Sequence, residues 1–505
     1  MSAYSHAAAP ALGLWKGLGY LLLAIAFGIA VILLGKLAIV GVVGLVFFIL
    51  FIYFPVLGLY ATTALLLLSG SQGIVGVVEG GALAVTLARL CGTAALGAWL
   101  VNLLIRKIRF EFNWPVIWLS AFCAWALLCT LVSPERAQVV PEWIRLVTLL
   151  GFFFLAVNTL NSTRNLHYFL VLIMVCGLLM SLAAVSQYFV PQLAVAGAEP
   201  WRAVTEDVAY IDQESLSGAP ALRVSGRAGH SNWLALVILL ILPLNSYWYA
   251  IAKSNKLKAL ILFTVAIEVV TLVLTFTRTG LIIGVVLAFL LLLKRLVRVT
   301  SLRIFAVLGL IVFGWIVLPQ PYKERVFSPQ QYTRSTSVQS RLDMQEAALR
   351  YFAQNPLFGY GSGGFGTQFI HERNQSAALM RMYVKYAGWQ PVFIGTHNMY
   401  LQLLADTGFV GFCLFMAFLT LLLRQLYLKE KRCIAEGDAQ GAAMASALFV
   451  SLVAFVLCAV FLHGLSQKIW WMIAAAAVVL CLYNMSFKEG LLPKWGWSTE
   501  AHRGR

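Results

Sequence analysis

The stretch "SNWLALVILLILPLNSYWYAIAKSNKLKALILFTVAIEVVTLVLTFTRTGLIIGVVLAFLLLLKRLVR", residues 231–298, decides the fold class. It holds three apolar runs, 231–251, 257–276 and 279–293, separated by short polar breaks. A membrane-spanning α-helix needs roughly 20 apolar residues, and these runs are continuous instead of alternating apolar with polar residues. The pattern therefore predicts an all-α polytopic membrane protein and excludes a transmembrane β-barrel.

The composition of the whole chain supports this prediction. Of 505 residues, 61% are hydrophobic and only 11% are charged. A soluble protein of this composition would lack the polar residues to cover its core. The first apolar run continues without a small-residue cleavage site, so we expect a retained anchor. Seven of the eight cysteines lie in apolar runs, and the seven histidines lack metal-ligand spacing, so neither disulfides nor a metal site are predicted.

Short basic loops between alternate pairs of spans set the orientation. The positive-inside rule places all four loops, and the C-terminus, in the cytoplasm. The sequence predicts 12 or 14 spans, because the segment 14–70 holds either one or three of them. The other apolar blocks lie near 81–104, 114–133, 141–158, 164–189, 231–251, 257–276, 279–293, 303–319, 398–423, 442–462 and 468–487. The loops carry Arg106, Lys107 and Arg109; Lys253, Lys256 and Lys258; Lys294, Arg295, Arg298 and Arg303; and Arg424, Lys429, Lys431 and Arg432.

This topology divides the chain into four parts. Residues 1–319 hold the N-terminal transmembrane helices and an outer loop near 190–230, and 320–396 form a large outer loop domain. Residues 397–487 hold the C-terminal spans, and 488–505 form a cytoplasmic tail. The outer loop 320–396 has an excess of arginine and lysine, which predicts either a solvated surface or a site that holds an anion.

Arginines at the outer boundary are the candidate anion ligands. Arg278 lies in a tight turn, "TFTRTG", between two apolar spans, where it either snorkels to lipid headgroups or binds a ligand. A guanidinium offers a planar fork of donors suited to phosphate oxygens. Arg223 and Arg341 lie on segments that could converge on the same pocket, so we predict a phosphate or pyrophosphate site. Arg145 is a weaker member, because Glu142 lies one turn away and offers a local ion pair.

The segment "GYGSGG", residues 359–364, fits G-x-G-x-x-G, but no βαβ unit surrounds it. A dinucleotide site is therefore not predicted. The "GYG" also lies in a polar loop with flanking residues that do not suit a potassium filter. We interpret this segment, with Gly359 and Gly361, as a flexible loop close to a bulky substrate.

His397 begins the predicted helix "HNMYLQLLADTGFVG" at the outer boundary. The helix dipole disfavours a protonated imidazole there, and a neutral imidazole suits a general base. From the residues alone, it is an equally good interpretation that His397 is a structural histidine at the membrane boundary, bonded to a carbonyl. Gly408 and Gly411 share a helix face with His397 and would allow another helix to approach, whereas Asp406 faces elsewhere with a structural role.

The motifs together resemble the O-antigen ligases and their polymerase-like relatives. The ligase motif is His, then Asn, Ser or Gln, nine residues, Gly, two residues, and Gly, Thr or Tyr, and His397, Asn398, Gly408 and Gly411 match it fully. The segment "RVSGRAGHSNWLA", with Asn232, resembles the family's Arg-x-x-Gly…Asn segment, and "FTRTG" resembles its Ser-Arg-Gly hairpin. The stretch "SRLDMQEAALRYFAQNPLFGYGSGGFG" resembles its loop of Arg, helix, Asn-Pro and Gly-x-Gly.

The resemblance implies a GT-C-type glycosyltransferase at the periplasmic face of a Gram-negative inner membrane. It implies a polysaccharide donor on undecaprenyl pyrophosphate, a lipid A–core sugar as acceptor, and no cofactor or metal ion. His397 would be the base, while Arg278, Arg341, Arg223 and Arg145 would bind the donor. Asn398, Asn232, Gly359 and Gly361 would support the site.

Three other functions remain open at this point. An O-antigen polymerase would use a lipid-linked glycan as acceptor, and a protein O-oligosaccharyltransferase would use a protein hydroxyl. A flippase of lipid-linked anions would favour ionisable residues at mid-membrane, which are scarce in this sequence: Glu268 is the clearest example, and the others cluster at one boundary.

Overall fold

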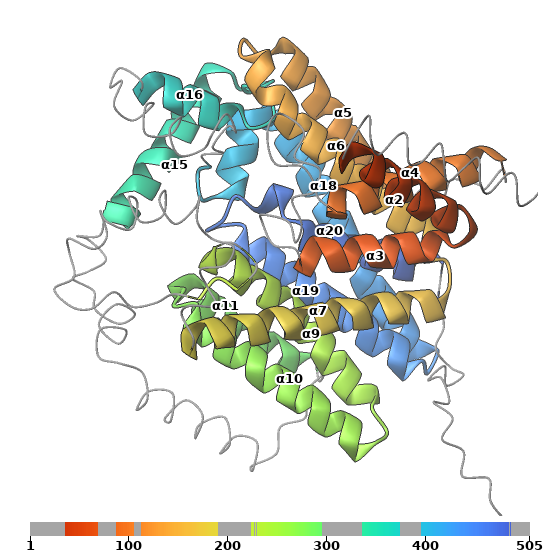
Figure 1. The fold of residues 1–505 in the computed structure, drawn as a ribbon. Helices are drawn as coiled ribbons and strands as arrows, with labels where there is room; N and C mark the ends of the chain where they lie inside the picture. The colour runs from red at the N-terminus through yellow and green to blue at the C-terminus, as the bar shows by residue number, and fades with distance from the viewer. Residues whose placement is uncertain are drawn as a thin grey trace, which may run out of the picture. The chain divides into compact units, whose positions relative to one another are not determined.

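A computed structural model describes residues 36–68, 87–105, 113–189, 224–226, 228, 230–294, 336–373, 395–483 and 485 (Figure 1). Every regular element in these ranges is a helix. The chain forms two compact units, Met1–Arg109 and Phe110–Arg505.

The first unit contains α2 (Lys36–Tyr53), α3 (Pro55–Leu68) and α4 (Leu87–Ile105). α4 packs against both α2 and α3. The side-chain amide of Asn102 donates to the carbonyls of Ile52 and Ala98, both at 3.0 Å, so this polar group is satisfied inside an apolar unit.

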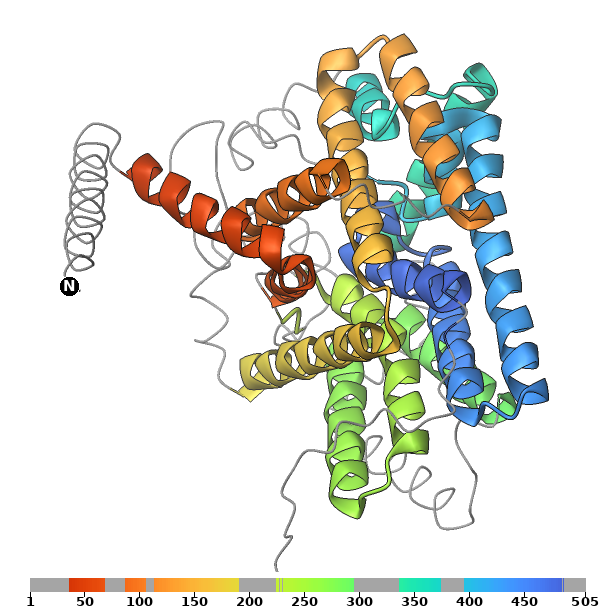
Figure 2. The same cartoon turned by 90° about the vertical axis from the view of Figure 1, so that its right-hand side faces the viewer.

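The second unit is a larger helical body. α9 packs against α19, α10 and α7, while α18 packs against α5, α19 and α15. In Figures 1 and 2, α9, α10 and α11 lie side by side in green. The helices are α5 (Trp114–Val132), α6 (Arg136–Thr159), α7 (Thr163–Phe189), α9 (Ser231–Ile251), α10 (Asn255–Leu274), α11 (Arg278–Leu293), α15 (Thr336–Gln354), α16 (Gly364–Arg373), α18 (Met399–Ala435), α19 (Ala439–Cys458), the 3-10 turn η2 (Gly464–Ser466) and α20 (Lys468–Leu482).

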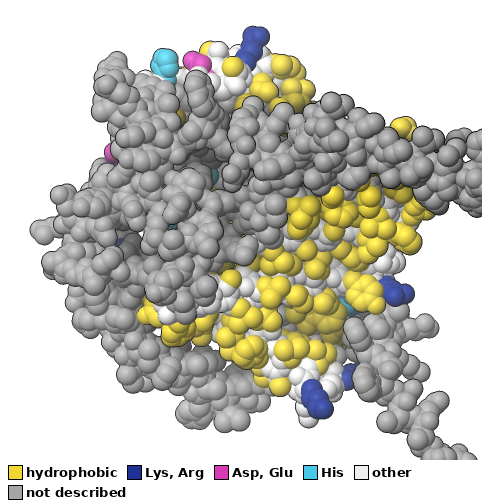
Figure 3. All heavy atoms as spheres, in the orientation of Figure 1, with side chains coloured by type: hydrophobic (Ala, Val, Ile, Leu, Met, Phe, Trp, Pro, Cys, Tyr) yellow, Lys and Arg dark blue, Asp and Glu magenta, His cyan; other side chains and the backbone are white. Residues whose placement is uncertain are grey.

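Eight described helices are long and apolar enough to cross a membrane, and four shorter apolar helices accompany them. Hydrophobic side chains cover much of the described surface in Figure 3, as expected for helices that face lipid. The prediction of an all-α integral membrane protein is confirmed. The choice between 12 and 14 spans is not tested, because the predicted span 303–319 and parts of 14–70 lie outside the described residues.

One predicted loop is wrong. The segment with Arg424, Lys429, Lys431 and Arg432 is helical, because α18 continues to Ala435. Positive charge near a membrane end does not itself terminate a helix, since long basic side chains reach water from its last turns.

The helix α18 is broken at Gly408, whose φ of 65° and ψ of −171° are not helical. The prediction that Gly408 would lie on a continuous helix face is therefore wrong. The N–H of Phe409 donates to the Pro356 carbonyl at 2.7 Å, and the carbonyl of Ala405 accepts from the Tyr360 N–H at 3.0 Å. Non-helical backbone in a membrane helix must be satisfied by other parts of the protein, and the loop after α15 does this here.

Two further contacts complete the break. The carbonyl of Asp406 accepts from the Gly361 N–H at 2.8 Å, and the carbonyl of Thr407 accepts from the indole N–H of Trp125 at 2.9 Å. Trp125 belongs to α5, so the break is held from two sides.

Candidate functional site

His397 lies in a tight turn, residues 395–398, directly before α18. Its φ is 54°, a left-handed conformation that a histidine adopts only at a cost of roughly 1–3 kcal/mol. The side chain of Asn398 caps α18, since its Oδ1 accepts from the N–H of Tyr400 at 3.0 Å and of Leu401 at 3.2 Å. Thr396 is tied down as well, because its N–H donates to Gln402 Oε1 at 2.9 Å. The turn therefore fixes the histidine between two anchored neighbours.

The ring of His397 lies against a second histidine. The ring centroids of His397 and His463 are 5.3 Å apart, with an interplanar angle of 72°. His463 lies between α19 and η2, and its other side contacts the ring of Trp233 at 5.3 Å. A Cβ on Gly395 would be 2.4 Å from the His463 ring, so the glycine permits this close approach.

The electrostatic surroundings keep His397 neutral. Burial first, then the neighbouring His463, Arg341 and His230, lower the pKa of His397 to about 2. Its Nδ1 is buried and has no hydrogen-bond partner in the described part of the chain. Nδ1 is therefore not the nitrogen of a carbonyl-bonded boundary histidine, and the choice between that alternative and a general base stays open.

Arg341 approaches the site from α15. This helix is fixed to the first half of α18 by a buried cluster formed by Met344, Ala347, Ala348, Tyr351, Phe365 and Ala405. Arg341 acts electrostatically on His397. The predicted convergence of Arg341, Arg223 and Arg278 on one pocket stays a prediction, because Arg223 lies outside the described residues.

Arg278 is the first residue of α11, after a three-residue turn from α10. Phe276 in this turn has a φ of 50°, and it is, with His397, one of the two described non-glycine residues with positive φ. The Thr275 and Thr277 hydroxyls are 3.0 Å apart and brace the turn. Gly280 allows α11 to approach α9, since its Cβ would lie 3.2 Å from that of Ala235. The predicted tight hairpin is confirmed.

Arg223 lies outside the described residues. The residue that follows it, Val224, donates its N–H to the carbonyl of Leu274 at 3.3 Å, at the end of α10. Asn232 lies in the first turn of α9, where its backbone N–H donates to His230 Nδ1 at 3.1 Å. The start of α9 therefore faces the α10–α11 turn. It also faces His397, because His230, just before α9, helps to lower the pKa of His397.

Gly359 and Gly361 anchor a loop to α18. Both have positive φ, 63° and 91°, and a Cβ on Gly359 would lie 2.6 Å from the Ala405 carbonyl oxygen. The expected flexible loop is therefore a wrong interpretation, because the backbone of this segment is bonded to the break in α18.

Asp406 holds the same loop through its side chain. Its Oδ1 accepts from the Phe365 N–H at 2.8 Å, at the start of α16. Its Oδ2 accepts from the Gly363 N–H at 3.1 Å and from Gln402 Nε2 at 2.9 Å. A carboxylate at a helix N-terminus is favourable, so the predicted structural role of Asp406 is what the geometry shows.

Arg145 lies on α6 and pairs with Glu142 at 3.0 Å, as its spacing suggested. Its side chain is 53% exposed, whereas that of Glu142 is 16% exposed. Glu142 also lines a cavity of about 50 Å³ whose other polar walls include Ser362, Gln402 and His463.

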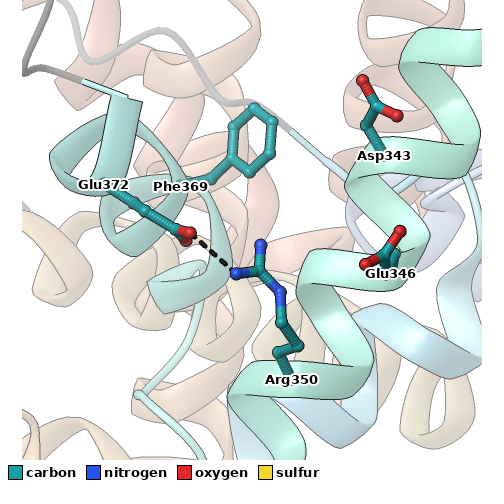
Figure 4. A pocket seen from close by; sticks show the side chains of 5 residues that line it. All are labelled: Asp343, Glu346, Arg350, Phe369 and Glu372. Carbon is teal, nitrogen blue, oxygen red and sulfur yellow. Dashed lines mark hydrogen bonds and ion pairs between the residues drawn. The ribbon is translucent and has the colours of Figure 1, made fainter.

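A second pocket, of about 220 Å³, lies between α15 and α16 and is drawn in Figure 4. Asp343, Glu346 and Arg350 line it from α15, and Phe369 and Glu372 from α16. Arg350 bonds Glu372 at 2.9 Å, and the Tyr351 hydroxyl donates to the same carboxylate. Among the described residues, no group of three His, Cys, Asp or Glu side chains is placed to hold a metal ion.

His463 and Trp233 are site residues that were not predicted from the sequence. The available signal for His463 was its place between the last two apolar blocks, on the outer side in the predicted topology. A lone histidine without a motif gave no reason to connect it with His397.

Comparison with known proteins supports the family. Residues 259–416 match the family model described as "O-Antigen ligase". A stretch of 83 residues is 31% identical to an uncharacterized protein of Haemophilus influenzae, and covers 16% of this chain and 19% of that relative. The chain thus matches about a fifth of that protein's length. The range 259–416, which is similar to the O-antigen ligase family, contains Arg278, Arg341 and His397.

Proposed function

We propose that the chain is a membrane glycosyltransferase of GT-C type that transfers O-antigen polysaccharide from undecaprenyl pyrophosphate to a sugar hydroxyl of lipid A–core. The reaction would take place at the periplasmic face of a Gram-negative inner membrane, during lipopolysaccharide biosynthesis. The observation that carries this proposal is the fixed, neutral His397 within electrostatic range of Arg341, inside the segment that matches the family.

In the proposed reaction, the acceptor hydroxyl oxygen attacks the anomeric carbon of the donor while the bond to pyrophosphate breaks. The configuration at that carbon inverts. His397 accepts the hydroxyl proton, and undecaprenyl pyrophosphate leaves with the bonding electrons. Arg341 and Arg278, with Arg223, would bind the pyrophosphate and stabilise its developing charge without a metal ion. Arg145 would contribute less to binding the pyrophosphate, because it already pairs with Glu142.

Donor binding would also strengthen the base. A pKa of about 2 makes free His397 a weak proton acceptor. Burial is the largest cause, and the positive charge of Arg341 is a further one. A bound pyrophosphate would neutralise that charge, so the imidazole would become more basic only when the donor is present. The arrangement therefore favours reaction with a bound donor.

Asn398 and Asn232 support this site through the backbone. Asn398 caps the helix that follows the base, and Asn232 continues the turn that His230 caps. Gly359 and Gly361 act further away, because they hold the loop of α15 and α16 against the first half of α18.

The test uses a deletion strain and the purified protein. Loss of long-chain lipopolysaccharide with accumulation of lipid-linked polymer is the expected result, and purified protein should transfer that polymer to lipid A–core. Single-repeat material would instead indicate a polymerase. Normal lipopolysaccharide with an unglycosylated protein would indicate a protein-directed transferase, and an intermediate left on the cytoplasmic leaflet would indicate a flippase.

A further inference from the structure

The start of α9 lies beside the proposed base. Trp233, in the first turn of α9, contacts the ring of His463 edge-to-face at 5.3 Å. The ring of His463 in turn contacts that of His397, with 5.3 Å between the ring centroids. His230 is the residue just before α9, and it is among the groups that act electrostatically on His397. Ring contacts and electrostatics thus both place His230 near the base.

The same end of α9 packs on the helix that Arg278 begins. A Cβ on Gly280, in the first turn of α11, would lie 3.2 Å from the Cβ of Ala235, early in α9. The first turns of the two helices therefore lie against each other. His230 is consequently at the junction of the segment that carries Arg278 and the segment that carries His397.

The hydrogen bond that caps α9 fixes the proton on the His230 ring. Its Nδ1 accepts from the backbone N–H of Asn232 at 3.1 Å, so this nitrogen must keep its lone pair. The single proton of the neutral imidazole is therefore on Nε2, which makes Nε2–H a hydrogen-bond donor. The capped form of the ring thus brings a donor to this junction and no positive charge.

The backbone of the first turn of α9 has already used its donors. The N–H groups of Trp233 and Leu234 both donate to the His230 carbonyl at 3.1 Å, and that of Asn232 donates to the cap. An anion at this end of α9 would therefore be bound by the His230 side chain and not by the N–H groups of the helix.

We propose that His230 binds the pyrophosphate of the lipid-linked substrate, with its Nε2–H donating to a phosphate oxygen. The inference rests on the proposed function, because it takes this pyrophosphate as the ligand of the site. In this arrangement Arg278 and Arg341 bind the phosphates with positive charge, whereas His230 binds an oxygen without adding charge.

A neutral donor at this position suits the neighbouring base. Burial is the main cause of the low pKa of His397, and positive charge on His230 lowers that pKa further. A cationic ligand of the pyrophosphate at this position would therefore weaken the base. The capped imidazole binds the leaving group and leaves the basicity of His397 unchanged.

Two substitutions separate this role from the capping role. His230→Asn keeps a good N-cap, because an asparagine side chain can accept the Asn232 N–H, but it has no group at the position of Nε2. His230→Gln is a poor N-cap, whereas its longer side chain brings an amide N–H close to the position of Nε2. A residue that only caps α9 and a residue that binds pyrophosphate therefore give opposite patterns in these two variants.

The experiment measures binding of undecaprenyl pyrophosphate to the full-length protein in lipid nanodiscs, together with thermal unfolding of the same samples. His230→Asn should unfold at the wild-type temperature and bind about 10- to 150-fold more weakly, the effect of losing a hydrogen bond to a charged group. His230→Gln should unfold at a lower temperature and keep most of the affinity. In transfer assays, His230→Asn should raise the KM for lipid-linked polymer and leave the KM for lipid A–core unchanged.

The matched control is His371→Asn, at an exposed position on α16, which should bind undecaprenyl pyrophosphate like the wild type. Wild-type affinity in His230→Asn would overturn the inference and leave His230 as a cap. Equal losses of affinity in His230→Asn and His230→Gln would also overturn it, since the Nε2–H would then not decide binding. A raised KM for lipid A–core alone would place His230 on the acceptor instead.

The proposed function can fail separately. Wild-type protein that binds undecaprenyl pyrophosphate but transfers no glycan to lipid A–core would contradict that function. The affinities of the two His230 variants would still decide whether His230 binds the pyrophosphate.

Discussion

The carbonyl oxygen of Leu357 lies 2.1 Å from the position that a Cβ atom on Gly408 would occupy. The glycine and the loop that approaches it form the break in α18, and the φ of Gly408 is 65°. A glycine is thus required at position 408 for two reasons. Its backbone has a positive φ, and the backbone at Leu357 occupies the space that a side chain would need.

Gly408→Ala is expected to destabilise the protein by more than about 1–2 kcal/mol, the cost of a left-handed conformation alone, because the Leu357 backbone must also move. The measurement is thermal unfolding of the purified protein in detergent. Gly41→Ala is the control: a helical glycine with no atom within 4 Å of its Cβ position, where little change is expected. Equal unfolding temperatures for the two variants would contradict the account of the break.

Asp406→Ala is expected to release the loop 357–365 from α18. The substitution leaves the N–H groups of Phe365 and Gly363 without their acceptor, and each unpaired buried donor costs about 1–3 kcal/mol. Limited proteolysis should cut this loop faster in the variant. Asp343→Ala, on α15, is the comparison, and equal cleavage of both variants would argue against the anchor.

Arg341→Ala and Arg278→Ala are each expected to weaken donor binding by about 10- to 150-fold, as for a lost charge-assisted hydrogen bond of about 1.5–3 kcal/mol. Binding of undecaprenyl pyrophosphate to the purified protein is the measurement. Arg350→Ala is the control on the same helix as Arg341, since Arg350 pairs with Glu372. Unchanged affinity in both site variants would defeat the anion site.

His397→Ala is expected to lower the transfer rate by about 10²–10⁴-fold, the usual effect of losing a general base. The pKa of His397 is about 2, so free enzyme keeps this base neutral throughout the range in which an ordinary histidine, near 6.5, becomes protonated. We therefore expect that kcat/KM does not fall as the pH is lowered through about 6.5. A clear fall with that midpoint would mean that the base is another group or an exposed histidine.

The same two histidines should make stability depend on pH. Their folded-state pKa values, about 2 for His397 and about 4 for His463, lie below the ordinary 6.5. Below about pH 6.5 the unfolded chain binds protons that the folded chain does not. The free energy of unfolding therefore falls as the pH is lowered, by up to about 1.4 kcal/mol for each histidine and each pH unit. His397→Gln and His463→Gln should flatten this fall in unfolding scans.

The fold class was predictable because long apolar runs have few alternatives in a membrane. The predicted hairpin at Arg278 is present because a short polar break between two apolar runs leaves room only for a tight turn. The ends of α18 were not predictable in the same way. Hydropathy marks where a helix leaves the membrane, and the helix continues through Arg432 because nothing in its last turns opposes helical structure.

The site was predictable where a motif fixes spacing, and less so where residues meet through the fold. His397 and Arg341 interact electrostatically, while the predicted pocket of Arg341, Arg278 and Arg223 stays a prediction. The helical spacing of Gly408 and Gly411 suggested a continuous face, whereas the chain is broken at Gly408 by a loop about fifty residues earlier in the sequence. His463 has no motif, and its contact with His397 depends on how α19 packs.

The break at Gly408 also divides α18 mechanically. The segment from Met399 to Thr407 is bonded to the loop after α15 and packed on α15 itself, whereas the segment beyond Phe409 belongs to the bundle. The first segment is also tied to the end of α19, because the Met399 N–H donates to the Ala459 carbonyl and the Tyr400 hydroxyl to the Val456 carbonyl, both at 2.8 Å. The single glycine at the break thus lets one stretch of chain satisfy two different sets of neighbours, so that the residue before α18 is held between α15 and α19 while the rest of the helix crosses the bundle.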